Sequence, residues 1–173
     1  KEYELDCLIF ATGFEVGTDY ARRAGFDPAG RNGLTLTQKW ANGARTLHGM
    51  HIHGFPNLYM MGITQSGFTV NFMHMIDQEA RHIAYVIDQA LRDRIGVLEV
   101  SAAAEAEWAQ TVFDRGDKTI EFAMNCTPGY YNGEGKLSPT TRQDGFFFGD
   151  TPMQYIEILE QDVRGHNMAK AAL

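Results

Sequence analysis

The sequence is poor in cysteine and has no long apolar run, and each shortage excludes a class of protein. Only two of the 173 residues, Cys7 and Cys126, are cysteine, so the disulfide scaffold of a small secreted protein is excluded. Cys7 lies in a short apolar stretch and is expected to be a small buried residue. No apolar run is long enough for a membrane span, and the N-terminus does not have the layout of a signal peptide. We therefore expect a cytoplasmic protein with no membrane partner.

Basic charge is also scarce. The chain carries 15 Lys and Arg against 22 Asp and Glu, a net charge of −7, and its only adjacent basic residues are Arg22 and Arg23. A nucleic-acid partner is therefore not expected, because binding to phosphate backbones needs a basic surface. What the sequence does have is an ordinary globular composition, with 44% hydrophobic and 21% charged residues, and a length that fits one domain.

Three apolar stretches predict β-strands. The first, Leu5–Phe10 in "DCLIFATGF", is expected to be buried in the middle of a sheet and to end in the turn Ala11–Gly13. The other two, about Thr46–His53 and Leu58–Gly62, flank a turn at Gly54–Asn57.

Helical periodicity is clearest from Val70 to about Arg94, where Gly96 follows as a stop. Shorter helices are expected at about Asp19–Ala24 and from Ser101, as N-cap, to about Phe113. The residues expected to face the core on the long helix are Met73, Ile76, Ala80, Ile83, Ala84, Ile87 and Leu91. Those expected to face it on the helix after Ser101 are Ala102, Ala106, Ala109, Val112 and Phe113.

A last helix is predicted to begin at "TPMQYIEIL". Thr151 and Gln154 have the spacing of a capping box, Pro152 takes the first helical position, and Gly165 would end the helix. Its inward residues are expected to be Met153, Ile156, Leu159 and Val163. The region before it, from Asn125 to Gly149, is a long loop rich in glycine and aromatic residues.

Three histidines form an H-x2-H-x-H cluster at His48, His51 and His53. Alternate residues of a strand share one face, so a metal site is conceivable. Zinc would need further Cys, His or carboxylate ligands at matched spacing, and none is evident in the sequence. The favoured interpretation is polar residues on a half-exposed strand, and no metal ligand is predicted.

Motifs for covalent catalysis and phosphate binding are weak. There is no G-x-S-x-G elbow, and Cys126 lacks an adjacent activating motif, although both a reactive thiol and a tight turn at Pro128–Gly129 stay open for "NCTPGYYNGEG". The stretch "GEGKLS", Gly133–Ser138, starts like a dinucleotide-binding fingerprint but runs into Pro139 instead of a helix. No catalytic residue is predicted.

The strongest candidate for a binding site is "MGITQSGFTVNF", Met61–Phe72. An apolar strand there ends in glycine and small polar residues and opens directly into the long helix. Such a junction exposes backbone N–H groups and the positive end of a helix dipole, which suit a phosphate, a carboxylate or the electron-rich edge of a cofactor ring. A plain turn capped by Thr69 or Ser66 explains the same pattern and, from these residues alone, is the favoured interpretation.

The order of these segments resembles a known family. The segments "DCLIFATGF", "GLTLTQKWANGARTLHGMHIHGFPNLYMMG" and "CTPGYYNGEGK", from Asp6 to about Lys136, are similar to the C-terminal portion of Baeyer–Villiger monooxygenases. These enzymes belong to the wider flavin-containing monooxygenase group. The ATG triplet alone is common to many flavoproteins, whereas the ordered set, with Trp40 and the TPGYYN loop, is far more specific.

The resemblance implies an α/β fold. The chain would be the C-terminal half of a split FAD-binding domain, Rossmann-like and of the two-dinucleotide-domain type, with an added helical and loop-rich C-terminal region. Residues 1–13 would be the hinge strand that returns from an absent NADPH domain, and residues 14–173 the C-terminal part of the FAD domain. Both G-x-G-x-x-G loops of the family would precede Lys1, so a fragment is expected.

The same resemblance implies a set of binding residues at the junction and in a later loop. The expected cofactor-binding residues are Thr12, Gly13, Gly62, Gln65, Ser66, Gly67, Thr69, Val70 and Asn71. The expected substrate-lining residues are Phe68, Phe72, Asn125, Thr127 and Tyr130. A helix N-terminus beside the flavin is physically sensible because the reduced ring carries negative charge at its N1–C2=O edge.

The implied function is that of a FAD- and NADPH-dependent monooxygenase that converts a ketone to an ester or lactone through a peroxyflavin. Its partners would be a ketone-type small molecule, O2 and the missing N-terminal part of the same enzyme, while a homo-oligomer stays open. The chain alone is expected to be inactive. Two alternatives also stay open: a fragment of an N- or S-oxidising flavin monooxygenase, and a non-catalytic binding module that kept the fold.

Overall fold

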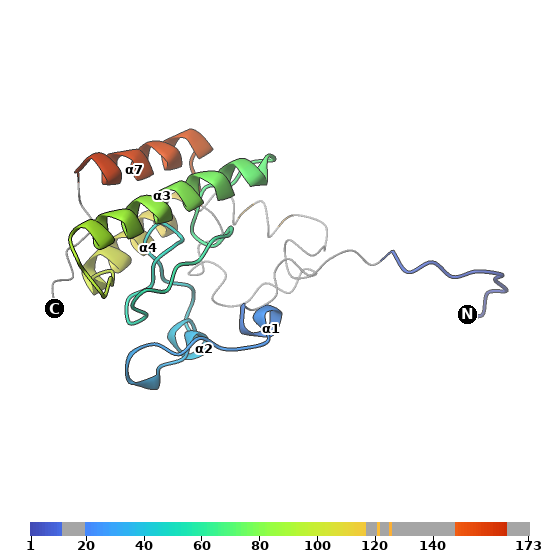
Figure 1. Cartoon of the computed structure of the whole chain (residues 1–173). Helices are drawn as coiled ribbons and strands as arrows, with labels where there is room; N and C mark the ends of the chain where they lie inside the picture. Colours follow the sequence, from blue (N-terminus) through green and yellow to red (C-terminus); the bar gives the residue numbers. More distant parts are fainter. Residues whose placement is uncertain (12–19, 117–120, 122–124, 126–147, 166–173) are drawn as a thin grey trace.

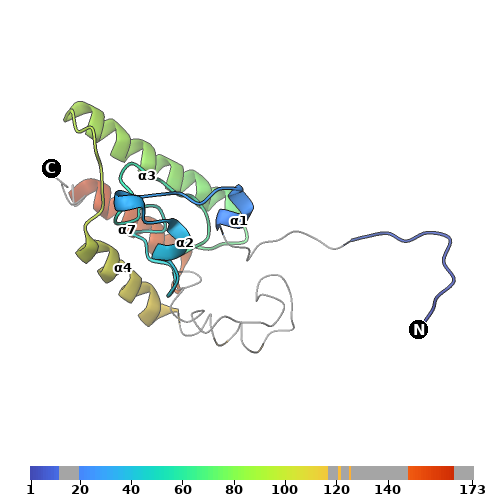
Figure 2. The same ribbon diagram turned by 90° about the horizontal axis from the view of Figure 1, so that it is seen from below.

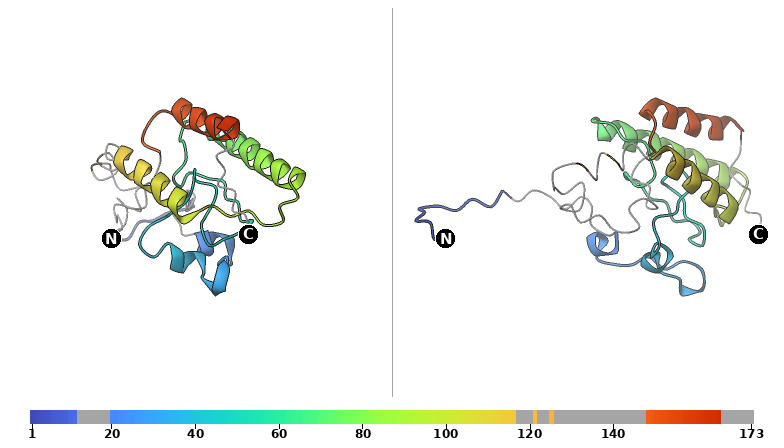
Figure 3. Two further views of the ribbon diagram at one scale, coloured as in Figure 1. Left: turned by 90° about the vertical axis from the view of Figure 1, so that its left-hand side faces the viewer. Right: turned by 180° about the vertical axis from the view of Figure 1, so that it is seen from behind.

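The computed structural model describes residues 1–11, 20–116, 121, 125 and 148–165. Three long helices, α3 (Phe72–Arg92), α4 (Ala102–Arg115) and α7 (Pro152–Gly165), form most of its regular structure. They surround a stretch of irregular backbone, residues 44–66, which lies between them in the left view of Figure 3. None of the described helices is both long and apolar enough to cross a membrane.

Three short helices lie on the side of that irregular backbone away from α7 (Figure 1). They are α1 (Tyr20–Ala24), the 3-10 helix η1 (Arg31–Gly33) and α2 (Leu36–Lys39). Leu36 of α2 forms a small second core with Ile52 and Phe55 of the irregular backbone, and Tyr20 of α1 packs against it. The prediction of a short helix at about Asp19–Ala24 is thereby confirmed as α1.

The predicted strand Leu5–Phe10 is not formed. Residues 1–11 contain no strand, and they run away from the helices in Figures 1 and 2. Ile9 is 82% exposed, and Cys7, expected to be buried, is exposed as well. An apolar sequence becomes a strand only where neighbouring backbone supplies hydrogen-bond partners, and among the described residues no segment pairs with this one.

The strand predicted at Thr46–His53 is wrong because its backbone turns back on itself. His48 and Gly49 have left-handed φ angles of 53° and 75°, which no strand contains. The resulting turn is closed by the Leu47 N–H, which donates to the His51 carbonyl at 2.7 Å. A Cβ on Gly49 would lie 2.8 Å from the Cβ of Ser66, so this turn needs glycine for space as well as for φ.

The strand predicted at Leu58–Gly62 is likewise reduced to an isolated bridge, between Tyr59 and His51. The turn predicted before it, at Gly54–Asn57, is present. Gly54 and Asn57 have φ angles of 90° and 57°, and the Phe55 N–H donates to the Ile52 carbonyl at 3.1 Å. The irregular backbone is therefore a succession of tight turns, although its apolar stretches are typical of strands.

Helices α4 and α7 begin where the sequence predicts them, because their caps are local signals. The Ser101 hydroxyl accepts the Ala104 N–H at 3.2 Å at the start of α4. At the start of α7 the predicted capping box is complete: the Thr151 N–H donates to Gln154 Oε1 at 3.0 Å, and the Gln154 N–H donates to the Thr151 hydroxyl at 3.3 Å.

The buried face of α3 is not the predicted one. Met73 and Leu91, two of the expected core residues, are 71% and 72% exposed, whereas Ile76 and Ile83 are half-buried. The residues that α3 buries are Met75, Glu79, His82, Val86 and Ala90. The prediction from periodicity considered apolar residues only. In the structure, α3 packs against the irregular backbone with a face that includes the polar residues Glu79 and His82.

The shorter helices follow their predicted faces in part. On α4, Ala109 and Val112 are buried as expected, but Ala102 and Ala106 are exposed. On α7, Ile156 and Leu159 are buried, whereas Met153 is 61% exposed. The main core lies between the three long helices and consists of Met50, Met75, Trp108, Val112, Phe148, Tyr155, Ile156 and Leu159.

Candidate functional site

The junction Gly62–Phe72 has an inner half that is built into the protein. Gln65, Ser66 and Gly67 are buried, and Gln65 has a left-handed φ of 57°. The Gln65 amide oxygen accepts the Thr46 N–H at 2.9 Å and the Thr46 hydroxyl at 2.7 Å, and its amide nitrogen donates to the Ala44 carbonyl at 2.9 Å. This side chain is therefore used to hold the irregular backbone together.

Gly67 is the point at which the junction touches the main core. A Cβ there would lie 2.7 Å from a ring carbon of Tyr155 and 2.8 Å from the terminal methyl of Met75. Just before it, the Trp108 indole N–H donates to the Gln65 carbonyl at 3.0 Å, and the Phe148 N–H donates to the Ser66 carbonyl at 2.9 Å. These contacts fix the path of the backbone that leads to α3.

The outer half of the junction faces solvent. Phe68 and Phe72 are 38% and 37% exposed, Val70 is fully exposed and Thr69 is half-buried. Asn71 is the N-cap of α3, and its side chain makes no capping hydrogen bond. The caps expected at Thr69 or Ser66 are wrong: the Ser66 hydroxyl donates instead to the Gly62 carbonyl at 2.5 Å. The positive end of α3 is thus presented beside exposed apolar side chains.

The remaining predicted residues are not brought to this surface by the described part of the chain. Asn125 is exposed and donates its side-chain N–H to the Glu121 carbonyl at 3.0 Å. Thr12, Gly13, Thr127 and Tyr130 lie outside the described residues, as do Cys126 and the stretch Gly133–Ser138.

A buried polar cluster beneath the junction is the feature that sequence reasoning missed. His48, His51, Glu79 and His82 are all buried, and Asp162 reaches them from α7 with a side chain that is 11% exposed. The Gly62 N–H donates to Glu79 Oε2 at 3.0 Å. Among the described residues, each of these five side chains has at least one buried polar atom without a hydrogen-bond partner. The expected half-exposed strand is therefore wrong for His48 and His51.

His53, the last histidine of the sequence cluster, is separate from this interior group. Its side chain is 42% exposed and its Nδ1 lies 2.9 Å from the Val100 carbonyl oxygen. The group gains His82 from α3 and Asp162 from α7 instead. No local spacing could have found them, because they lie 34 and 114 positions after His48 in the sequence.

Burial controls the charges in this cluster. It lowers the pKa of His48 and His51 to about 3 and that of His82 to about 4, because an imidazolium loses its hydration there, and His82 adds to the shift of the other two. It raises the pKa of Glu79 to about 7, against the opposing hydrogen bonds from Gly62 and Ser66. The histidines are therefore neutral at pH 7, and Glu79 takes up its proton near neutrality.

Sequence comparison places the chain among oxygenases. No family model matches it. It is 40% identical to pentalenolactone D synthase of Streptomyces exfoliatus over 163 residues, which cover 93% of this chain and 28% of that protein. It is 42% identical to a Baeyer–Villiger monooxygenase of Streptomyces coelicolor over 139 residues, which cover 80% and 23%. The chain thus spans about a quarter of the length of the curated relatives that it matches.

Solved structures agree. A polycyclic ketone monooxygenase from Thermothelomyces thermophila superimposes with a TM-score of 0.84 and 31% identity over 98% of this chain and 28% of that one. Cyclohexanone monooxygenase from Rhodococcus sp. Phi1, bound to NADP+, gives 0.76 and 28% over 95% and 29%. The chain therefore has the fold of a portion of a monooxygenase. Its sequence corresponds to a portion of the Baeyer–Villiger monooxygenases, which confirms the resemblance to that family.

Proposed function

We propose that this chain is the flavin-facing part of a FAD- and NADPH-dependent monooxygenase that converts a ketone to an ester or lactone. The observation that carries the proposal is the 40% identity with pentalenolactone D synthase across 93% of the chain. The ketone and the nicotinamide cofactor are suggested by the structural relatives, which are a polycyclic ketone monooxygenase and an NADP+-bound cyclohexanone monooxygenase. The remaining parts of such an enzyme would come from a longer protein.

The outer half of the junction supports a position beside the flavin. Val70 and the edges of Phe68 and Phe72 offer an apolar surface for a planar ring. Asn71 leaves the first turn of α3 without a side-chain cap, so its N–H groups and the helix dipole can stabilise negative charge next to that surface. FAD supplies the redox chemistry when it is bound. The residues of this chain would orient the ring and keep water away from one side.

The inner half of the junction has a supporting role in this proposal. The side chains of Gln65 and Ser66 form hydrogen bonds with backbone groups of this chain, and Gly67 leaves room for Tyr155 to pack against the turn. These residues would fix the position of the outer half instead of touching the cofactor. The division at residue 13 between a hinge strand and the FAD domain, and the split Rossmann arrangement, belong to the same proposal.

Flavin binding tests the proposal in a chimera. Residues 1–173 replace the matching segment of the polycyclic ketone monooxygenase, and the visible spectrum of the gel-filtered protein gives the flavin content. We expect about one flavin per chain and bleaching of its absorbance by NADPH. Val70→Asp should lower the affinity for FAD about tenfold or more, because it sets a negative charge beside the electron-rich ring edge.

Met153→Asp is the matched control, since Met153 is an exposed apolar residue at the start of α7. It should leave the flavin content unchanged. A chimera that folds and elutes like its recipient but stays colourless contradicts the proposal. If the Val70→Asp variant and the unmodified chimera bind flavin with equal affinity, the outer half of the junction is not part of the flavin site.

A further inference from the structure

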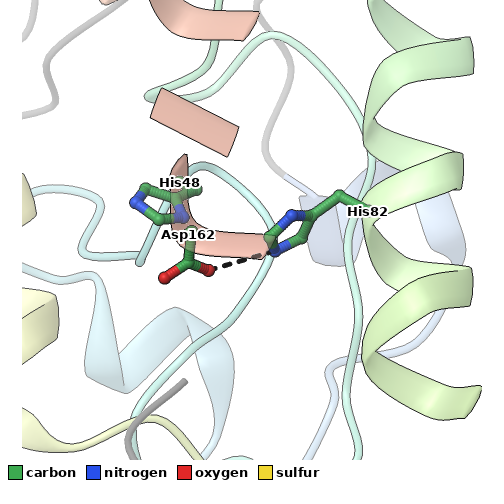
Figure 4. A group of neighbouring side chains, drawn as sticks. All are labelled: His48, His82 and Asp162. Atoms are coloured by element: carbon green, nitrogen blue, oxygen red, sulfur yellow. Dashed lines mark ion pairs between the residues drawn. The ribbon is translucent and has the colours of Figure 1, made fainter. Parts of the chain in front are cut away.

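The interior cluster contains three side chains of the types that hold divalent metal ions. His48 comes from the tight turn at residues 47–51, His82 from the middle of α3 and Asp162 from the last turns of α7. One ligand atom of each lies within 4.8 Å of those of the other two. Figure 4 shows the three side chains converging, with the dashed line between His82 and Asp162.

The polar atoms in this group lack the partners that buried polar groups require. The exposed fractions of His48 and His82 are only 7% and 3%. Within the described part of the chain, Nδ1 of His48, both ring nitrogens of His82 and Oδ2 of Asp162 have no hydrogen-bond partner. A buried polar atom without a partner is destabilising, because it has lost its hydrogen bonds to water and gained none in return. Three converging residues in this state indicate that something binds between them.

The backbone holds these side chains in place from outside the group. His48 has a left-handed φ of 53°, its carbonyl accepts the Tyr155 hydroxyl at 2.7 Å, and its ring lies edge-on to Trp108 at 4.7 Å. The Tyr85 hydroxyl, one turn after His82, donates to the Val163 carbonyl at 3.1 Å and ties α3 to α7. The group is therefore pre-arranged by contacts that do not involve its ligand atoms.

We propose that His48, His82 and Asp162 bind a divalent transition-metal ion, with Zn²⁺ the best match, and that the ion joins α3, α7 and the turn at residues 47–51. Two imidazoles and a carboxylate are ligands that zinc commonly takes, with a fourth position left for water. Ligand atoms of one tetrahedral zinc ion lie about 3.4 Å apart. The His82 Nε2 to Asp162 Oδ2 distance of 3.7 Å is close to that spacing.

The structure also has an open pocket next to the metal-binding group. An open pocket of about 270 Å³ lies between α3 and α7, and His82 is part of its wall. The other lining residues are Gln78, Arg81, Tyr85, Ile156, Leu159, Glu160 and Val163. Both ring nitrogens of His82 are buried, so an ion would enter the group through a local opening between α3 and α7. The ligand atoms of the site differ from the residues of the proposed flavin surface, which is formed by the exposed side chains of Phe68, Val70 and Phe72.

Zinc titration of the chelator-treated chain tests the proposal. Competition with a chromophoric chelator should give one Zn²⁺ per chain, and saturating zinc should raise the unfolding temperature by about 5–10 °C through preferential binding to the folded state. Co²⁺ in the same site should show the visible absorption of a four-coordinate ion. His82→Gln and Asp162→Asn should each lower zinc affinity about 100-fold or more.

His53→Gln is the control for adventitious binding, because His53 is a partly exposed histidine outside the group. It should bind zinc like the unmodified chain. Circular dichroism establishes that each variant is folded, and two ligand variants are used so that failure of one to fold leaves the other as the test. Absence of stoichiometric zinc binding overturns the proposal. So does binding that survives both ligand substitutions, or that is lost in His53→Gln.

Discussion

Gln65 illustrates how one residue can matter to a site without touching its ligand. Its amide hydrogen bonds to Thr46 and Ala44, and its carbonyl accepts the indole N–H of Trp108. These bonds hold the left-handed turn from which Phe68 and Val70 emerge. The resemblance to the monooxygenases implies Gln65 as a cofactor-binding residue, whereas in the structure its side-chain amide is bound to Thr46 and Ala44.

Glu79 should make stability depend on pH. Its pKa is raised to about 7 from an ordinary 4.5 because it is buried, so the folded state keeps a proton that the unfolded state has already lost. The stability associated with this group is fully present below about pH 4.5 and is lost as the pH rises through about 7. We expect Glu79→Gln to unfold at higher urea concentration than the unmodified chain at pH 8, by on the order of 2 kcal/mol.

The measurement is a series of urea titrations of both proteins between pH 4.5 and 8, with a chelator present throughout. Gly62 N–H and the Ser66 hydroxyl face Glu79, and Tyr155, with a pKa raised well above its ordinary value, stays uncharged over this range. The difference between the two curves should therefore widen with rising pH. A constant difference would mean that Glu79 is ionised in the folded state throughout.

At the residue scale, local signals were predictable and distant ones were not. Ser101 and Thr151 cap their helices as the sequence indicates, because a cap binds N–H groups only three residues away. The His48, His82 and Asp162 group depends on three segments that meet only after folding. The sequence shows His48 only together with His51 and His53, with no further ligand at matched spacing, and therefore predicts no metal ligand.

The structure and the sequence disagree about which stripe of helix α3 is buried. Val86 is 2% exposed, whereas Leu91 is 72% exposed. We expect Val86→Ala to cost about 2 kcal/mol of unfolding free energy and Leu91→Ala less than about 0.5 kcal/mol, measured by urea unfolding of the isolated chain. The reverse order, with Leu91→Ala the more costly, would mean that the stripe predicted from periodicity is the buried one.

At the element scale, the helices were predictable and the strands were not. Helices satisfy their own backbone hydrogen bonds, so α3, α4 and α7 can be read from periodicity and caps. A strand depends on neighbours, and Leu5–Phe10 has none among the described residues. At Thr46–His53 the left-handed pair His48 and Gly49 breaks the strand, and the sequence gives a hint only at the glycine.

In the described part of the molecule, large apolar side chains are exposed near one end and on α3. Leu8, Ile9 and Phe10 are exposed near one end, and Met73 and Leu91 on α3. Large exposed apolar patches mark surfaces that bind other protein. This agrees with a chain that spans 28% of pentalenolactone D synthase and with the proposal that further parts of the enzyme cover these residues. The architecture could not be predicted from the chain alone. Its turns and helices correspond to a portion of the polycyclic ketone monooxygenase fold.

The most direct test of the proposed function is the product that the chimera forms from a polycyclic ketone with NADPH and oxygen-18. We predict an ester or lactone that carries one labelled oxygen atom, formed with consumption of one NADPH, while the isolated chain with added FAD forms none. Steady ketone oxidation by the isolated chain would contradict the idea that it is only part of the enzyme. A flavin-loaded chimera that leaves the ketone untouched and oxidises an amine or a sulfide would contradict the proposed reaction and favour an N- or S-oxidising monooxygenase.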